Sequence, residues 1–214
     1  MIKSLELIKT VNVQASPLSV CHFNGSVCAS LQNKSIVQIN SEYNVDSFAK
    51  MPSRPDGVFA HNNRLYSLGC GGKSSITIYD NAKNRLDIWG TWMHPDHCNH
   101  NHVVIMSNQC IVPDRKNRCL RIYNQSKELV DSISLEHIED DKEYLAMCIA
   151  GENSVAIANQ KKVFKVDIKT RTVVWTCSDI DKPLGITCYK EKYLLVCCYD
   201  SESLHVVDIE TGKC

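Results

Sequence analysis

The 214-residue sequence predicts an all-β fold built from five repeated units of short strands. The main observation is a set of five apolar runs that end in Asn or Asp at intervals of 40 to 44 residues: Asn40, Asp80, Asn124, Asp167 and Asp208. An apolar residue stands four positions before each of these ends. Asn and Asp favour turns there because their side chains hydrogen-bond nearby backbone groups. The second observation is that helical periodicity is absent over any useful length.

Other strand-like runs fall into the same frame. The third unit shows the order in full, with "HVVIM", "QCIVP", "LRIYN" and "LVDSI" following one another. Short β-rich runs bounded by Gly, Asn, Asp, Ser or Lys indicate strands joined by turns. Four strands repeated every 40–45 residues are typical of the blades of a β-propeller.

We therefore predict a single β-propeller domain over residues 1–214 with about five visible four-stranded blades. The expected blades cover residues 15–51, 52–94, 95–138, 139–180 and 181–214. The last unit lacks a fourth strand, whereas an orphan strand, residues 5–13, precedes the first unit within residues 1–14. Either this N-terminal strand completes the last blade and closes the ring, or the chain is a fragment of a longer, six-bladed propeller.

Composition and sequence pattern indicate which binding partners and which cellular compartment to expect. The chain carries 24 basic and 24 acidic residues, so net charge gives no reason to expect DNA or a membrane as partner. No apolar run approaches the length of a membrane span, and the N-terminus lacks the pattern of a signal peptide. Most of the 12 cysteines lie in apolar runs, and no C-x-x-C occurs. We expect a cytoplasmic protein without cofactors.

Two segments resemble a known repeat family. "CIVPDRKNRCLRIYN", residues 110–124, has an apolar strand, Asp114, a polar turn with Asn117-Arg118, and a second strand. "KPLGITCYKEKYLLVCCYDSESLHVVDIETGK", residues 182–213, opens on Pro-x-Gly-Ile and continues in a similar order. Both resemble the NHL repeat, known from the propeller at the C-terminus of tripartite-motif proteins. The resemblance implies a propeller that binds a protein or an RNA.

One loop contains possible metal ligands. "HPDHCNHNH", residues 94–102, holds four histidines and one cysteine, and we take His97 and His100 as candidate binding residues. Imidazole and thiolate groups bind zinc, but the spacing fits no closed four-ligand pattern and no second cluster supplies further ligands. We therefore favour a polar loop between blades and expect no metal.

A basic loop follows the second strand of the third unit. Arg115, Lys116 and Arg118 could contact a phosphate backbone. Since strand direction alternates within a blade, this loop and residues 94–102 should share one face, with the Asn/Asp turns on the other. Aromatic side chains for base stacking are not evident there, and the acidic segment 136–143 should share that face and oppose RNA. We favour ordinary solvated charge.

The favoured function is a non-catalytic interaction module that presents a loop face to a protein partner, as in the partner-binding part of a tripartite-motif-like protein. An RNA-binding NHL-type propeller that uses the basic loops is the alternative. A metal-dependent propeller hydrolase is the third reading and the least supported. No G-x-S-x-G, P-loop or G-x-G-x-x-G motif occurs, and Cys197-Cys198 lies in an apolar run, so we expect no enzyme.

Overall fold

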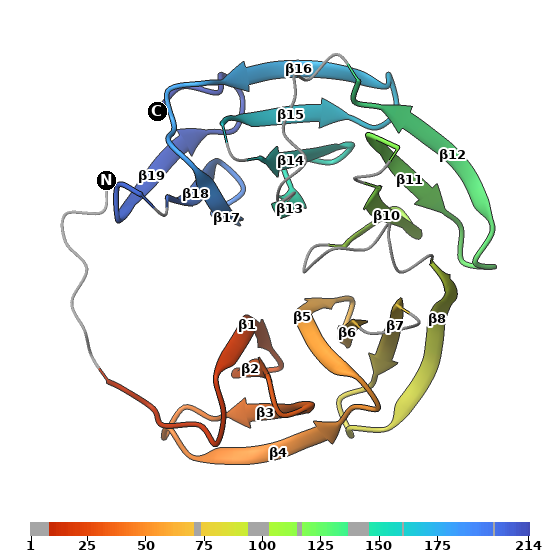
Figure 1. Cartoon of the computed structure of the whole chain (residues 1–214), viewed down its shortest axis with the longest axis vertical. Coiled ribbons are helices and arrows are strands. Elements are labelled where there is room, and N and C mark those ends of the chain that lie inside the picture. The colour runs from red at the N-terminus through yellow and green to blue at the C-terminus, as the bar shows by residue number, and fades with distance from the viewer. Residues whose placement is uncertain are drawn as a thin grey trace. The chain divides into compact units, whose positions relative to one another are not determined.

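The computed structural model describes residues 9–70, 74–93, 103–114, 117–136, 146–159, 161–198 and 200–214. The secondary-structure elements in these ranges are all β-strands (Figure 1). In the described parts of the chain, no helix is long and apolar enough to cross a membrane. The chain divides into two compact units, Met1–Gly69 with Thr77–Asp87, and Cys70–Ile76 with Ile88–Cys214.

The strands form five sheets that follow one another along the chain. The first is β1 (Pro17–Phe23), β2 (Ser26–Leu31), β3 (Ser35–Ile39) and β4 (Val45–Lys50). The second is β5 (Arg54–His61), β6 (Arg64–Cys70), β7 (Ser74–Tyr79) and β8 (Arg85–Met93). The third is β9 (Val104–Met106), β10 (Gln109–Asp114), β11 (Cys119–Tyr123) and β12 (Leu129–Ser134). Each strand pairs with the next along the chain, as predicted.

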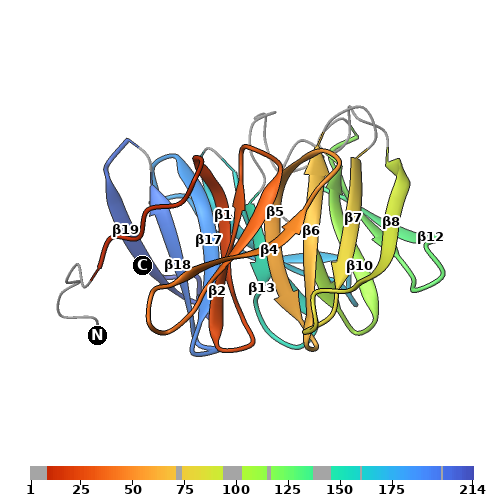
Figure 2. The ribbon, with the colours of Figure 1, turned by 90° about the horizontal axis from the view of Figure 1, so that it is seen from below.

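The fourth sheet is β13 (Ala146–Ile149), β14 (Ser154–Ala158), β15 (Val163–Asp167) and β16 (Thr172–Cys177). The fifth is β17 (Pro183–Tyr189), β18 (Tyr193–Cys198) and β19 (Ser203–Asp208). Neighbouring strands in the first, third, fourth and fifth sheets are antiparallel. In the first sheet, β1 and β2 are antiparallel neighbours, with Cys21 opposite Cys28 (Figure 2).

The Asn and Asp turns form as expected. After β3, the Asn40 side chain accepts a hydrogen bond from the Asn44 amide at 2.9 Å, and Asp80 accepts the Asn84 amide at 2.8 Å after β7. Asn124 after β11, Asp167 at the end of β15 and Asp208 at the end of β19 accept backbone amides in the same way. Each carboxylate or amide oxygen thus fixes the reversal of the chain after the third strand of its sheet.

The apolar side chains are buried between successive sheets within each unit. In the first unit a cluster with Phe23, Phe48 and Tyr79 joins the first two sheets. In the second unit one cluster, which includes Ile111 and Phe164, lies between the third and fourth sheets, and another lies between the fourth and fifth sheets. Strands buried on both faces require the nearly continuous apolar runs seen in the sequence.

The N-terminal segment differs from the predicted strand. Residues 5–8 lie outside the described residues, and residues 9–13 form no strand. Val13 and Ala15 instead pack against Ala29, Leu31 and Val37 of the first sheet. Among the described residues the fifth sheet has three strands, and residues 9–13 of the expected 5–13 strand are not paired with it. Partial burial of Val13 beside β2 and β3 accounts for its apolar character without strand pairing.

Candidate functional site

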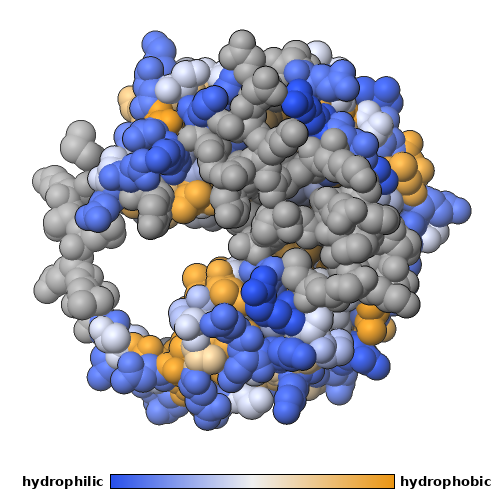
Figure 3. Space-filling model, in the orientation of Figure 1, coloured by the Kyte–Doolittle hydropathy of each residue, from blue (hydrophilic) through white to orange (hydrophobic). Residues whose placement is uncertain are grey.

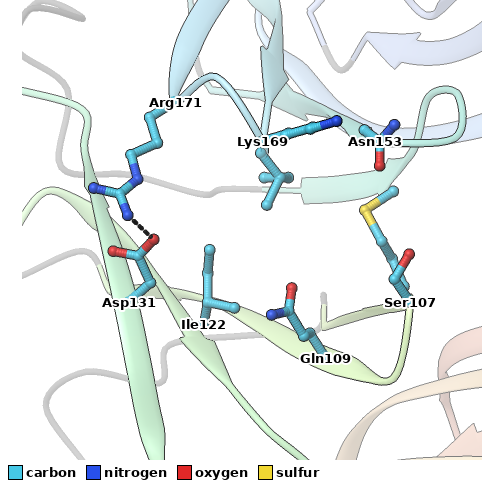
Figure 4. Close-up of a pocket in the computed structure, with 9 residues that line it drawn as sticks. Ser107, Gln109, Ile122, Asp131, Asn153, Lys169 and Arg171 are labelled. Atoms are coloured by element: carbon cyan, nitrogen blue, oxygen red, sulfur yellow. Dashed lines mark ion pairs between the residues drawn. The ribbon is translucent and has the colours of Figure 1, made fainter.

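A groove of about 320 Å³ lies between the third and fourth sheets, inside the second unit (Figure 4). Its apolar lining comes from Met106 of β9, Ile122 of β11 and Ile168, which follows β15. Ile122 and Met106 are buried. On the face drawn in Figure 3, the described residues are mostly hydrophilic with small apolar patches. The floor of the groove is therefore apolar and mostly buried, and Ile168 is its partly exposed member.

Polar side chains line the groove above this floor. Ser107 and Gln109 come from the start of the third sheet, and Asn153 and Lys169 come from turns of the fourth sheet. Within the described residues, no hydrogen bond or ion pair occupies these four side chains. Figure 4 shows the Lys169 side chain extending toward Asn153. A hydroxyl, two amides and an ammonium group are therefore available to a ligand.

An ion pair bridges the two sheets at one end of the groove. Arg171 donates to Asp131 of β12 across 2.6 Å, and the side chains are 60% and 27% exposed. This exposure means that solvent screens much of the attraction, so the pair adds little stability. Its main consequence for a ligand is that the charges of Asp131 and Arg171 cancel each other.

The turn that carries Lys169 and Arg171 is held in a defined geometry. Asp167 accepts hydrogen bonds from the Thr170 amide at 2.7 Å and the Thr170 hydroxyl at 3.0 Å. The Thr170 amide is the main cause that holds the pKa of Asp167 below its usual range. The Ile168 amide donates to the Asn153 carbonyl at 2.8 Å, which ties this turn to the β13–β14 turn. Local hydrogen bonds thus place Lys169 beside Asn153.

Of the five candidate residues from the sequence, only Arg118 is among the described residues. His97, His100, Arg115 and Lys116 fall outside the described residues, as does segment 137–145. Arg118 is described: it is partly buried, and its carbonyl accepts the Leu135 amide at 2.7 Å. Ser107 precedes β10 and Arg118 follows it, so Ser107 of the groove and Arg118 are at opposite ends of that strand.

The part of the NHL-like motif that the structure describes has a structural role. Asp114 is 1% exposed and accepts the Asn117 amide at 3.0 Å and the Asn117 side-chain nitrogen at 2.8 Å. Arg121 of β11 lies 2.6 Å from the same carboxylate. These contacts join the end of β10 to β11. The sequence motif that we interpreted as a binding loop thus includes Asp114, a buried residue that stabilises the β10–β11 hairpin.

Sequence reasoning missed the groove because no local motif encodes it. Its polar residues come from four separate places along the chain, and each one is an ordinary turn or strand residue by itself. These residues come together only because the third sheet packs against the fourth. As for a metal, the described residues contain no group of three or more His, Cys, Asp or Glu that could hold one.

Neither a protein-family model nor a curated protein matches this chain. Solved structures do match. A protein of unknown function from Bacteroides caccae is 13% identical, with a TM-score of 0.73, and the alignment covers 94% of this chain and 81% of that chain. A chain of the Mitotic Checkpoint Complex is 11% identical, with a TM-score of 0.68 and coverage of 98% and 72%. The WD40 beta propeller domain of Doa1 is 12% identical, with a TM-score of 0.64 and coverage of 94% and 67%.

This chain has a β-propeller fold. Five successive sheets and the match to a known propeller domain agree on it, and the fold class predicted from the sequence is confirmed. At identities this low the likeness extends to the fold alone. Propellers serve many functions, so the function must be argued from the groove.

Proposed function

We propose that this propeller is a non-catalytic interaction module whose groove between the third and fourth sheets receives a segment of a protein partner. The groove itself carries the proposal. It combines buried Ile122 with polar side chains that have no partner among the described residues. Protein recognition sites pair apolar contact with a few oriented polar groups in this way.

Fold neighbours support a protein partner without naming one. Two of them come from assemblies, the Mitotic Checkpoint Complex and the Nidogen/Laminin Complex. In line with the NHL resemblance, the proposed module would be the partner-binding part of a tripartite-motif-like protein. RNA binding through Arg115, Lys116 and Arg118 is less favoured, since Arg118 is partly buried and takes part in backbone pairing.

A groove-blocking substitution tests the proposal. Asn153 is exposed in the β13–β14 turn, and its side chain makes no hydrogen bond within the described chain, so Asn153→Trp should fill the groove without unfolding the protein. Gln125→Trp, at an exposed turn position outside the groove lining, is the matched control. Both variants should melt within a few degrees of the parent chain, because exposed substitutions cost roughly 0.5 kcal/mol or less.

The measurement is quantitative affinity capture from nuclease-treated extract with the parent chain and both variants as bait. We expect a defined set of proteins that Asn153→Trp loses and Gln125→Trp retains. Equal capture by all three baits would show that the groove is not the interaction surface. Capture that disappears from every bait after nuclease treatment would instead favour the RNA alternative.

A further inference from the structure

The charge and hydrogen-bonding pattern of the groove points to one kind of partner segment. We infer that the groove binds the carboxylate of a Glu or Asp side chain of a protein partner. This inference rests on the proposed function and adds the chemistry of the partner.

Net charge in the groove is positive. Lys169, Arg171 and Asp131 are its charged lining residues, and the last two neutralise each other across 2.6 Å. Lys169 is exposed and forms no ion pair with a described residue. An anionic group that enters the groove therefore meets one uncompensated cation. A cationic group would have to displace Arg171 from Asp131 before it gained a partner.

Hydrogen-bond donors strengthen the preference for an acceptor. Asn153 lies beside Lys169, and Ser107 and Gln109 line the groove from the third sheet. An ammonium group, two amide NH₂ groups and one hydroxyl can all donate, whereas an ionised carboxylate only accepts. Charge-assisted hydrogen bonds to such a carboxylate are stronger than bonds between neutral groups. A neutral amide in its place would gain fewer and weaker bonds.

A carboxylate fits this groove better than a phosphate does. Phosphate recognition commonly relies on an arginine fork that binds two oxygens at once. Arg171 already donates to Asp131, and Lys169 supplies a single point charge. The apolar floor of Met106, Ile122 and Ile168 can contact the methylene groups that connect a carboxylate to its backbone. We therefore infer an acidic side chain of an unmodified peptide.

The test uses a minimal acidic peptide unit. N-acetyl-glutamate methylamide is titrated into the isotopically labelled full chain, and backbone amide shifts are followed by NMR. N-acetyl-glutamine methylamide is the neutral isostere and N-acetyl-phosphoserine methylamide the phosphate arm. We expect saturable shifts at Ser107, Gln109, Asn153 and Lys169 with the glutamate unit and binding at least fivefold weaker with the glutamine unit. The phosphoserine unit should bind no more tightly than the glutamate unit.

Two lysine variants separate the groove charge from net charge. Lys169→Met should weaken binding of the glutamate unit about fivefold to tenfold, as expected for loss of one partly solvated charge interaction. Lys213→Met removes the same charge from an exposed position that does not line the groove, and it should change binding less than twofold.

Failure of this inference can be told apart from failure of the proposed function. Equal binding of the glutamate and glutamine units, tighter binding of the phosphoserine unit, or no shift up to about 20 mM probe overturns the acidic-partner inference. If Asn153→Trp also loses captured proteins while Lys169→Met retains them, the groove binds a partner through other chemistry. If neither variant changes capture, the proposed function fails as well.

Discussion

The indole N–H of Trp175 donates a hydrogen bond to the backbone carbonyl of Ile209 across 2.8 Å. Trp175 lies in β16, the outer strand of the fourth sheet, and Ile209 follows β19 of the fifth sheet. The Lys165 ammonium group donates to the same carbonyl across 3.3 Å, and Lys165 is only 7% exposed. One carbonyl of the fifth sheet is thus held by two donors of the fourth, beside the apolar cluster between them.

Loss of the indole donor should destabilise the protein. Trp175→Phe keeps an aromatic ring but removes the N–H, and we expect a decrease of about 1 kcal/mol in the free energy of unfolding, the usual net value of a hydrogen bond. Thr176→Ala, an exposed neighbour on the same strand, should change it by less than about 0.5 kcal/mol. Urea unfolding measures both. Equal stability of Trp175→Phe and the parent chain would mean that the bond contributes nothing.

Gly212 is required beside the same tryptophan. Its φ is +68°, and a Cβ added there would lie 2.6 Å from Cδ2 of Trp175. Gly25 has a similar φ of +73° with no heavy atom within 4 Å of an added Cβ. Gly25→Ala therefore reports backbone strain alone, and Gly212→Ala reports strain together with the clash.

Comparison of the two glycine variants gives the second prediction. We expect Gly25→Ala to cost about 1 kcal/mol and Gly212→Ala to cost at least about 2 kcal/mol, since ring displacement adds to the strain. Trp175→Leu should reduce the added cost of Gly212→Ala toward the Gly25 value, as a double-mutant cycle would show. Thermal unfolding of the variants checks this. Similar costs for the two alanine variants would exclude a role for the ring contact.

The fold could be predicted from the sequence because its signals are local and repeated. Asn40, Asp80 and their three equivalents each fix a turn through their own side chains, and the apolar runs between them are short enough to be strands only. Residues 9–13 have the same apolar pattern but pack as an irregular segment. Pattern alone does not distinguish a side chain buried under a sheet from one in a paired strand.

The candidate site could not be predicted in the same way. Ser107, Asn153 and Lys169 are exposed residues of unrelated turns, and their juxtaposition depends on how the third and fourth sheets pack. The groups singled out in the sequence were instead clusters within single loops. Clustering along the chain draws attention to loops such as residues 114–118, where buried Asp114 shows that part of the signal serves the hairpin.

Asp114 provides the third prediction. Its carboxylate is nearly inaccessible and binds Arg121 and Asn117, so Asp114→Ala removes this shared acceptor from both groups. Because Arg121 remains 31% exposed and can be partly solvated, we expect a loss of roughly 2 to 4 kcal/mol, at or below the cost of breaking a buried pair. Asp131→Ala, which removes the exposed groove pair, should cost less than about 1 kcal/mol. Chemical unfolding of the two variants compares them, and equal costs would contradict the ranking.

Two thiols should react slowly for an electrostatic reason. Cys21 of β1 and Cys28 of β2 face each other in register, and both are free. Burial is the main cause that raises the pKa of Cys21 to about 12 and that of Cys28 to about 11. Relative to a thiol of pKa 9.0, Cys21 should hold roughly a thousandth of the reactive thiolate near pH 8.

Timed alkylation with iodoacetamide, followed by peptide mass spectrometry, tests this fourth prediction. Cys197 is exposed and serves as the reference thiol. In the folded protein the rate at Cys21 should stay far below the rate at Cys197 and rise about tenfold for each pH unit from 7 to 9, as its thiolate fraction does. In 8 M urea the two rates should converge, because the barrier comes from the folded environment. Matching rates in the folded protein would show that Cys21 is neither desolvated nor shielded in the first sheet.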